Sequence, residues 1–141
     1  MTPLEALQQT LAGEHAAVYV FRALAGRVST SADPDLANGL AAAYALHRGR
    51  RDQLVTMVRA ASGDPVAADV SYQLPNPSRT PAQLRSGALV TEQRCSDVYA
   101  TMVGSTARVD RQWAIDALTD SAVRQLGFGG APDPFPGVPE L

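Results

Sequence analysis

The sequence predicts an all-α protein, a single four-helix bundle that takes up all of residues 1–141. Apolar residues recur with the 3.6-residue period of a helix over four long stretches, about 3–28, 34–62, 81–104 and 107–126. Three of these stretches begin with Thr or Asp directly before proline, a common helix start. No segment is a convincing β-strand candidate. We therefore expect the core to form by helix packing alone.

The helix expected over about 3–28 begins with a capping box, in which Thr2 is the cap and Glu5 follows three residues later. Its apolar stripe consists of Leu4, Leu7, Leu11, Val18, Phe21 and Ala25. Glu14 lies in the centre of that stripe, between Leu11 and Val18. A carboxylate that points into a core needs a polar partner there.

The helix expected over about 34–62 starts at Asp33 and Pro34 and stops before Gly63. At about 100° per residue, one face collects the apolar residues Leu36, Leu40, Ala43, Leu54, Val58 and Ala61. Tyr44, His47 and Arg51 fall on the same face. The sequence therefore predicts that this helix brings a phenol, an imidazole and a guanidinium into the core.

The segment from Gly63 to Arg79 contains three prolines and no regular pattern, and it is long for a connection in a compact domain. In a bundle, such a segment suits a crossover that runs the full length of the helices. The next helix would then lie parallel to its predecessor. We expect an up-down-down-up arrangement, with the long crossover between the second and third helices.

The helix expected over about 81–104 is capped by Thr80, and Glu92 falls within its apolar face. The fourth helix, about 107–126, is expected to bury a stripe made of Ile115, Leu118, Ala122 and Leu126. Asp120 is expected on its far side, in a surface ion pair with Arg124 four residues later. The tail, 127–141, is rich in glycine and proline, so we expect an extended strap held on the bundle by Phe128, Phe135, Val138 and Leu141.

Composition excludes several classes of partner. A net charge of about −2 gives no basic surface for nucleic acid or an anionic membrane. No stretch approaches the apolar length of a membrane span, and the N-terminus has no signal-peptide pattern. Cys95 is the one cysteine, which fits a reducing compartment and a buried, unreactive thiol. We expect a cytoplasmic protein without a nucleic-acid or membrane partner.

Several segments resemble one known family: EHAAVY (Glu14 to Tyr19), YALHRGRRD (Tyr44 to Asp52), the helix around Glu92, ALTDSAVR (Ala117 to Arg124) and FPG near the C-terminus. The chain resembles the ferritin-like superfamily, and most closely the actinobacterial ferritin-like family of unknown function, DUF4439. The resemblance covers nearly the whole chain and implies a ferritin-like four-helix bundle. It implies no activity, because none is established for that family.

The resemblance also gives a pattern of metal ligands, of which this sequence holds half. Glu14, His47 and Glu92 match the first-helix carboxylate, the second-helix histidine and the third-helix carboxylate. Tyr44 stands where the second-helix glutamate should be, and the fourth helix offers no Glu-x-x-His. Arg51 would add a positive charge that repels a metal cation. A complete di-metal centre is therefore not expected.

Two interpretations of the polar cluster follow. In the favoured one, Glu14, Tyr44, His47, Arg51 and Glu92 form an ion-pair network in which Arg51 bridges the two carboxylates and no cofactor binds. The protein would then be non-catalytic and act by self-association, as a homodimer, or by binding an unidentified protein partner. In the alternative, it is an iron- or manganese-dependent oxidoreductase or iron-handling protein with a reduced metal site on Glu14, His47 and Glu92.

Two further residues and the space between the helices have expectations of their own. His15, on the edge of the first stripe, is expected to bond a neighbouring helix. Trp113 lies off the fourth stripe and is expected either under the C-terminal strap or at a subunit contact. A small apolar ligand between the helices has no signature in the sequence, so that question stays open.

Overall fold

The computed structural model describes residues 1–138, and among these it contains four helices and no strand. The helices are α1 (Pro3–Ala25), α2 (Pro34–Ala60), α3 (Pro81–Ser105) and α4 (Arg108–Gly127). The all-α bundle predicted from the sequence is confirmed. The largest difference in a boundary is at the end of α1, which stops at Ala25 rather than near residue 28.

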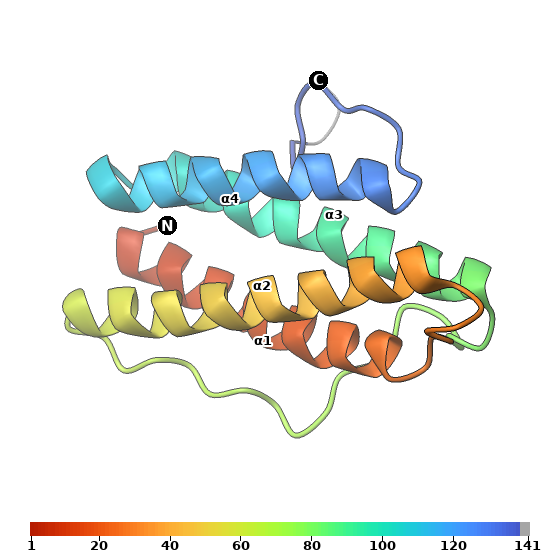
Figure 1. Ribbon diagram of the computed structural model, residues 1–141. Helices are drawn as coiled ribbons and strands as arrows, with labels where there is room; N and C mark the ends of the chain where they lie inside the picture. The colour runs from red at the N-terminus through yellow and green to blue at the C-terminus, as the bar shows by residue number, and fades with distance from the viewer. Residues whose placement is uncertain (139–141) are drawn as a thin grey trace.

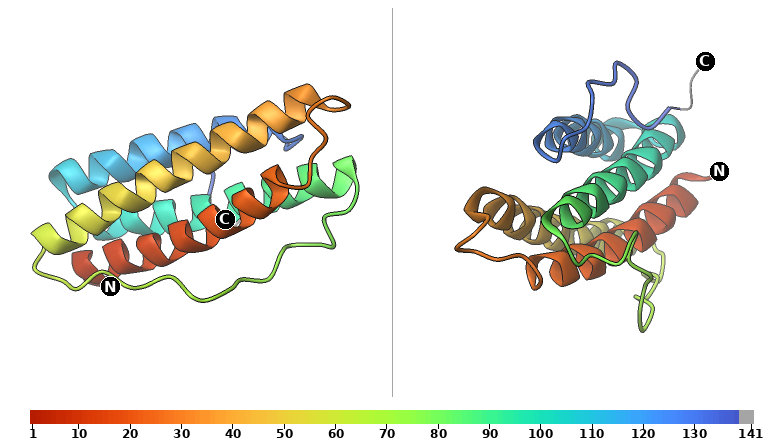
Figure 2. Two further views of the ribbon diagram at one scale, coloured as in Figure 1. Left: turned by 60° about the horizontal axis from the view of Figure 1, so that its bottom comes forward. Right: turned by 90° about the vertical axis from the view of Figure 1, so that its right-hand side faces the viewer.

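The helices run up, down, down and up, as Figure 1 shows. The long crossover carries the chain from the end of α2 back along the bundle, so α3 runs parallel to α2 (Figures 1 and 2). α1 packs against α2 and α3, and α4 packs against α3. The single crossover between the second and third helices is the connection expected from the sequence. No helix within residues 1–138 has the length and apolar character needed to cross a lipid bilayer.

Local signals explain where the helices begin. Thr2 and Glu5 form the complete capping box: the Thr2 hydroxyl accepts from the Glu5 amide at 3.2 Å, and the Glu5 carboxylate accepts from the Thr2 amide at 2.7 Å. Thr80 caps α3 in the same manner through the Gln83 amide. The Asp33 side chain makes no cap bond, so proline at the first position defines the start of α2.

Two apolar clusters make up the core, and polar residues lie between them. The larger cluster contains Phe21, Leu24, Leu40, Tyr99 and Phe128, and the smaller one contains Leu7, Leu11, Leu54, Val58 and Met102. Along α1 and α2, Glu14 and His47 fall between the residues of one cluster and those of the other. The polar residues predicted from the sequence therefore lie in the middle of the bundle.

The stripe predicted for α4 is wrong at its two ends, although the half-buried Leu118 within it packs against the core. The helix buries Ala114, Ala117, Ser121 and Gln125, whereas Ile115 and Leu126 are 39% and 46% exposed. The inward side chains are short or amide-bearing, and the buried hydroxyl of Ser121 and amide of Gln125 bond to α3 through Ser96. Those bonds satisfy polar groups that burial would otherwise penalise. The apolar side of α4 is left facing outward.

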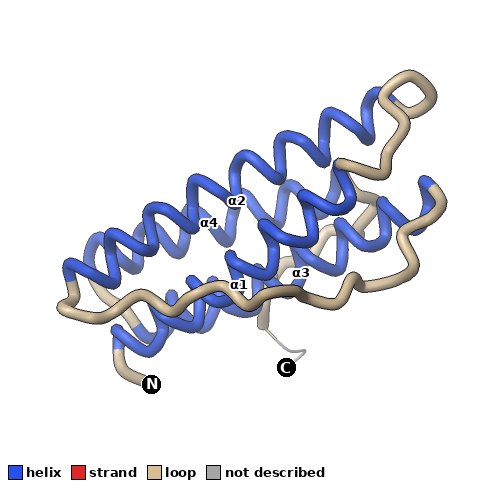
Figure 3. The backbone as a smooth tube through the Cα atoms, turned by 90° about the horizontal axis from the view of Figure 1, so that it is seen from below, coloured by secondary structure: helices blue, strands red, loops and turns tan. Residues whose placement is uncertain are grey.

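Two segments without helix lie on the surface of the bundle. The crossover follows α1 (Figure 3) and is held there by Gln8, which donates to the Asp64 carbonyl at 2.6 Å and accepts from the Val66 amide at 2.9 Å. In the tail, Phe128 is buried against Phe21, as expected. Phe135 and Val138 are 64% and 47% exposed, so neither is a buried anchor, but the tail lies against α3 where Gly137 approaches the Ser96 carbonyl. Leu141, the last residue expected to hold it, lies outside the described residues.

Candidate functional site

His47 lies at the centre of the buried polar site, between two carboxylates. Its Nδ1 is 2.7 Å from Glu14 Oε2 and its Nε2 is 3.1 Å from Glu92 Oε1, and all three side chains are fully buried. Two carboxylates accept hydrogen bonds only, so both ring nitrogens must carry protons and the ring is an imidazolium. Its face stacks on Phe21, 5.1 Å away. These contacts hold the ring in one orientation.

The protonation of His47 reflects a balance of two opposing effects. Burial alone would lower the pKa of the imidazole, because it disfavours the charged form. The charges of Glu14 and Glu92, and their hydrogen bonds to the ring, outweigh burial and raise the pKa from 6.5 to about 9. His47 is therefore charged at neutral pH.

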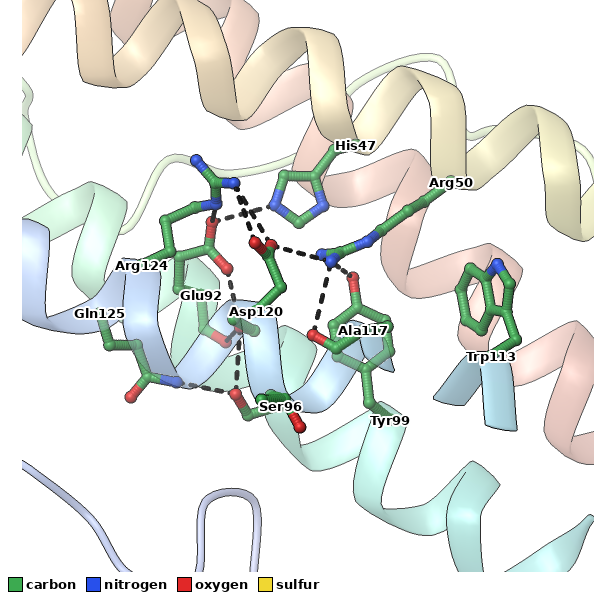
Figure 4. Close-up of polar contacts among 12 residues, drawn as sticks. His47, Arg50, Glu92, Ser96, Tyr99, Trp113, Ala117, Asp120, Arg124 and Gln125 are labelled. Carbon is green, nitrogen blue, oxygen red and sulfur yellow. Dashed lines mark hydrogen bonds and ion pairs between the residues drawn. The ribbon is translucent and has the colours of Figure 1, made fainter. Parts of the chain in front are cut away.

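Each carboxylate has a second partner. The Tyr99 hydroxyl donates to Glu14 Oε1, and the Ser121 hydroxyl donates to Glu92 Oε2 at 2.7 Å. Arg124 brings its Nε within 3.5 Å of Glu92 Oε1 (Figure 4). The two carboxylates therefore accept from residues on α2, α3 and α4, and the site joins all four helices.

Arg50 extends this network toward α4. Its side chain is buried, and it donates to Asp120 Oδ2 at 2.9 Å, to the Tyr99 hydroxyl at 3.2 Å and to the Ala117 carbonyl at 3.5 Å. Its guanidinium also lies over the Tyr99 ring, 5.2 Å from the ring centre. Burial opposes the charge, but Tyr99, Glu14 and Asp120 keep the pKa of Arg50 above its ordinary value. Figure 4 shows Asp120 between Arg50 and Arg124.

The charges of this network balance. It contains three carboxylates and three cations, namely Glu14, Glu92, Asp120, His47, Arg50 and Arg124. An unbalanced charge at this depth would be destabilising by several kcal/mol. We call these six residues, together with Tyr99 and Ser121, the ion-pair network.

The structure brings together three of the five predicted residues and excludes two. Glu14, His47 and Glu92 meet as predicted. Arg51 does not bridge the carboxylates: it bonds Asp52 at 2.8 Å near the surface, and Arg50 takes the inward position. Tyr44 is half-buried under the guanidinium of Arg48 and forms no hydrogen bond with the network.

The position of α4 determines which of the two neighbouring arginines, Arg50 or Arg51, joins the network. On a helical wheel Arg50 and Arg51 lie about 50° to either side of the apolar stripe of α2, at about 100° per residue. Periodicity alone therefore cannot choose between them. α4 carries Asp120 on the side that Arg50 faces, and α3 places the Tyr99 hydroxyl there as well. Arg51 faces the other way, toward solvent.

Other members of the network carried weaker signals in the sequence. Tyr99 looked like an ordinary residue of the apolar face of α3, and nothing marked its hydroxyl as a partner of Glu14. The pair between Asp120 and Arg124 is formed, with 3.2 Å between its atoms, but it is half-buried rather than on the far side. The role of Ser121 was not predicted, because the apolar stripe predicted for α4 did not include its position.

Arg50 and Arg51 provide a matched pair of substitutions. We expect Arg50→Met to lower the free energy of unfolding by about 2–3 kcal/mol, because Asp120 and the Tyr99 hydroxyl lose a buried partner. Arg51→Met should change it by less than about 0.5 kcal/mol, since the lost ion pair is near the surface. Urea unfolding followed by circular dichroism measures both. Equal losses in the two variants would contradict the assignment of Arg50 to the network.

The remaining sequence predictions have simple outcomes. His15 bonds the Val66 carbonyl of the crossover at 2.9 Å rather than a neighbouring helix. Cys95 is buried, and burial raises the pKa of its thiol, so the expectation of an unreactive thiol agrees with its surroundings.

Trp113 is not under the tail: it packs edge-on against Tyr99 and donates to Gln53 on α2 at 2.7 Å. It lines a cleft of about 570 Å³ between α2 and α4.

The residues present do not match a metal site. Within residues 1–138, no group of three or more His, Cys, Asp or Glu side chains is arranged to hold a metal ion. Both nitrogens of His47 carry protons that face carboxylate oxygens, so the ring offers no lone pair to a metal. Beside Glu92, α4 presents Ser121 and Arg124 where a ferritin-like centre would have a carboxylate and a histidine.

Comparison with known proteins gives a family and a solved structure of the same fold. The profile of a family described as "Domain of unknown function (DUF4439)" matches residues 6–140. The crystal structure of a conserved hypothetical protein, rv2844, from Mycobacterium tuberculosis is similar over 90% of this chain and 87% of that chain, with a TM-score of 0.82 and 28% sequence identity. No protein with a curated description matches the sequence.

Proposed function

This chain belongs to the DUF4439 family, a family of unknown function, and from that premise we propose that it is a non-catalytic bundle that acts by associating with a second copy of itself. In this proposal the ion-pair network is structural. It replaces a metal centre, sets the register of the four helices and takes no part in a reaction. The outer side of α4 forms the contact between the two copies.

The hydrogen bonding of the two central carboxylates supports a structural role, although the buried Nε of Arg124, 3.5 Å from Glu92, makes no hydrogen bond. The carboxylates of Glu14 and Glu92 each accept from a hydroxyl and from His47. A catalytic acid or base must have a position that a substrate can reach. Both carboxylates are fully buried, and their partners are side chains of the protein itself. Such a network specifies packing rather than chemistry.

The observation that carries the proposal is the apolar outer strip of α4. Ile115, Val123 and Leu126 are 39%, 64% and 46% exposed, and the half-buried Leu118 and Ala122 lie beside them. Contiguous apolar patches on a protein surface often mark interaction sites. Two copies of α4 that meet around a two-fold axis would cover both strips with one self-complementary contact.

Charged residues placed in the outer strip should abolish self-association. We expect the double variant Val123→Glu and Leu126→Glu to be monomeric at concentrations where the unaltered protein is a dimer, with affinity reduced at least about 100-fold. Sedimentation velocity over a concentration series measures this. Val70→Glu is the matched control, because Val70 is a fully exposed valine of the crossover. A protein that stays monomeric before any substitution would contradict the proposal.

One observation favours the alternative, a metal-dependent oxidoreductase or iron-handling protein. Glu14, His47 and Glu92 converge at the midpoint of the bundle, where such proteins hold their metals. Metal binding there would require His47 to lose a proton and Arg124 to withdraw from Glu92. One or two metal ions per chain, found by elemental analysis after anaerobic loading with Fe(II) or Mn(II), would favour the alternative over our proposal.

A further inference from the structure

A second cavity lies between α1, α3 and the crossover, and it shares no lining residue with the ion-pair network. Its volume is about 290 Å³. The floor consists of small and apolar side chains, among them Ala17 and Val20 of α1 and Cys95 and Val98 of α3. Tyr72 and Gln73 of the crossover cover one side. The cavity exists because α1 and α3 face each other with short side chains while the crossover spans the gap between them.

The crossover that covers the cavity is fixed in place. Tyr72 packs on Tyr19 of α1, with 5.5 Å between the ring centres, and its hydroxyl accepts from the Asp69 amide at 2.9 Å. On the N-terminal side of Tyr72, His15 forms a hydrogen bond with the Val66 carbonyl. On the C-terminal side, Arg27 donates to the Pro77 carbonyl at 3.2 Å. Figure 3 shows the crossover following the bundle past α1 toward α3. The cavity is therefore largely preformed, as small-molecule sites usually are.

Two polar side chains at the rim of the cavity, Arg94 and Gln73, are exposed to solvent and have no partner within the described residues, whereas the Thr91 hydroxyl donates to the Gly87 carbonyl at 2.7 Å. Arg94 forms neither an ion pair nor a hydrogen bond with residues 1–138, and the Gln73 side chain likewise forms no hydrogen bond there. A guanidinium beside an apolar cavity matches a carboxylate, which it can bind through two parallel hydrogen bonds. An uncharged ligand would leave the Arg94 guanidinium without an ion-pair partner.

We propose that this cavity binds a small carboxylic acid that carries a single ring. Cavities of about 150 Å³ hold benzene, so the present volume accommodates one ring and a short chain. The ring would lie on the floor formed by Val20, Cys95 and Val98. The carboxylate would meet Arg94, with Gln73 as an additional donor. This site is independent of the outer strip of α4, which lies on another helix.

Methyl NMR with phenylacetate as probe tests the proposal. We expect saturable chemical-shift changes at the methyl groups of Val20 and Val98 and none at Val123, which is on α4. Ala16→Phe should abolish these changes, because Ala16 lines the cavity and a larger side chain would fill it. Absence of shifts at Val20 and Val98 at millimolar phenylacetate would overturn the proposal, as would unchanged binding by Ala16→Phe.

The role of Arg94 has its own control. Arg94→Gln should weaken phenylacetate about fivefold, the effect of losing one partly exposed ion pair. The same substitution should leave 2-phenylethanol, which has the ring but no carboxylate, with unchanged affinity. Arg85→Gln removes an exposed arginine of the same helix and should change neither. Equal weakening of acid and alcohol by Arg94→Gln would overturn the preference for a carboxylic acid.

Discussion

Replacement of His47 by leucine is expected to lower the free energy of unfolding by about 3–5 kcal/mol. The imidazolium is the one cation that contacts both Glu14 and Glu92, and all three side chains are fully buried. Without it, two carboxylates face each other across a gap that leucine fills with apolar atoms. Burial of like charges without compensation is among the largest single-site effects known in proteins.

Urea unfolding at neutral pH measures this loss, and two further variants identify its cause. His15→Leu removes the other histidine, whose bond to the Val66 carbonyl lies near the surface, and should change stability by less than about 1 kcal/mol. Glu14→Gln in the His47→Leu background neutralises one of the facing carboxylates while its side chain still accepts from Tyr99. It should therefore recover part of the loss. A further loss in the double variant would contradict like-charge repulsion as the cause.

The fold could be predicted from sequence because its signals are local. Thr2, Thr80 and the prolines that follow them define helix starts through bonds within one turn, and these signals depend on no other helix. The crossover could be predicted because a seventeen-residue stretch from Gly63 to Arg79 cannot be a tight turn. The parallel direction of α2 and α3 then follows from its length (Figure 1).

The site could be predicted only where a charge falls unambiguously inside an apolar stripe. Glu14, His47 and Glu92 do so, and all three meet in the core. Arg50 and Arg51 lie on opposite edges of the stripe, so their roles depend on where α4 lies. That position is a property of the tertiary structure, which the pattern of a single helix does not contain.

The apolar stripe of α4 was also predicted wrongly because it depends on the tertiary structure. Its most apolar side, with Ile115 and Leu126, faces outward, while Ser121 and Gln125 face the core. Hydrophobic periodicity assigns the apolar side inward because it assumes that a helix has one partner surface. Here the polar inward side chains bond to α3, and the apolar side remains exposed. The error in the predicted stripe and the proposed dimer contact thus have one origin.

Stability should also fall as the pH rises from about 6.5 to 9, by about 3 kcal/mol in total. Folding raises the pKa of His47 from 6.5 to about 9 because Glu14 and Glu92 stabilise the imidazolium more than burial disfavours it. Between these two values the folded protein holds a proton that the unfolded chain has released. The stabilisation is complete below pH 6.5 and is lost as the pH approaches and passes 9.

The pH profile of a variant that lacks His47 separates this effect from other titrations. Burial raises the pKa of Cys95 and of Tyr99 above their ordinary values, so these groups reduce stability only at higher pH, where the unfolded chain begins to ionise. Urea midpoints measured from pH 6 to 8 should therefore fall for the unaltered protein and change much less for a His47→Leu variant that also carries Glu14→Gln, which lacks both the imidazole and the facing pair of carboxylates. A level profile in the unaltered protein would mean that His47 is neutral, and a neutral ring could not donate to both carboxylates. The ion-pair network depends on that single proton, because without it the cluster would bury a net negative charge.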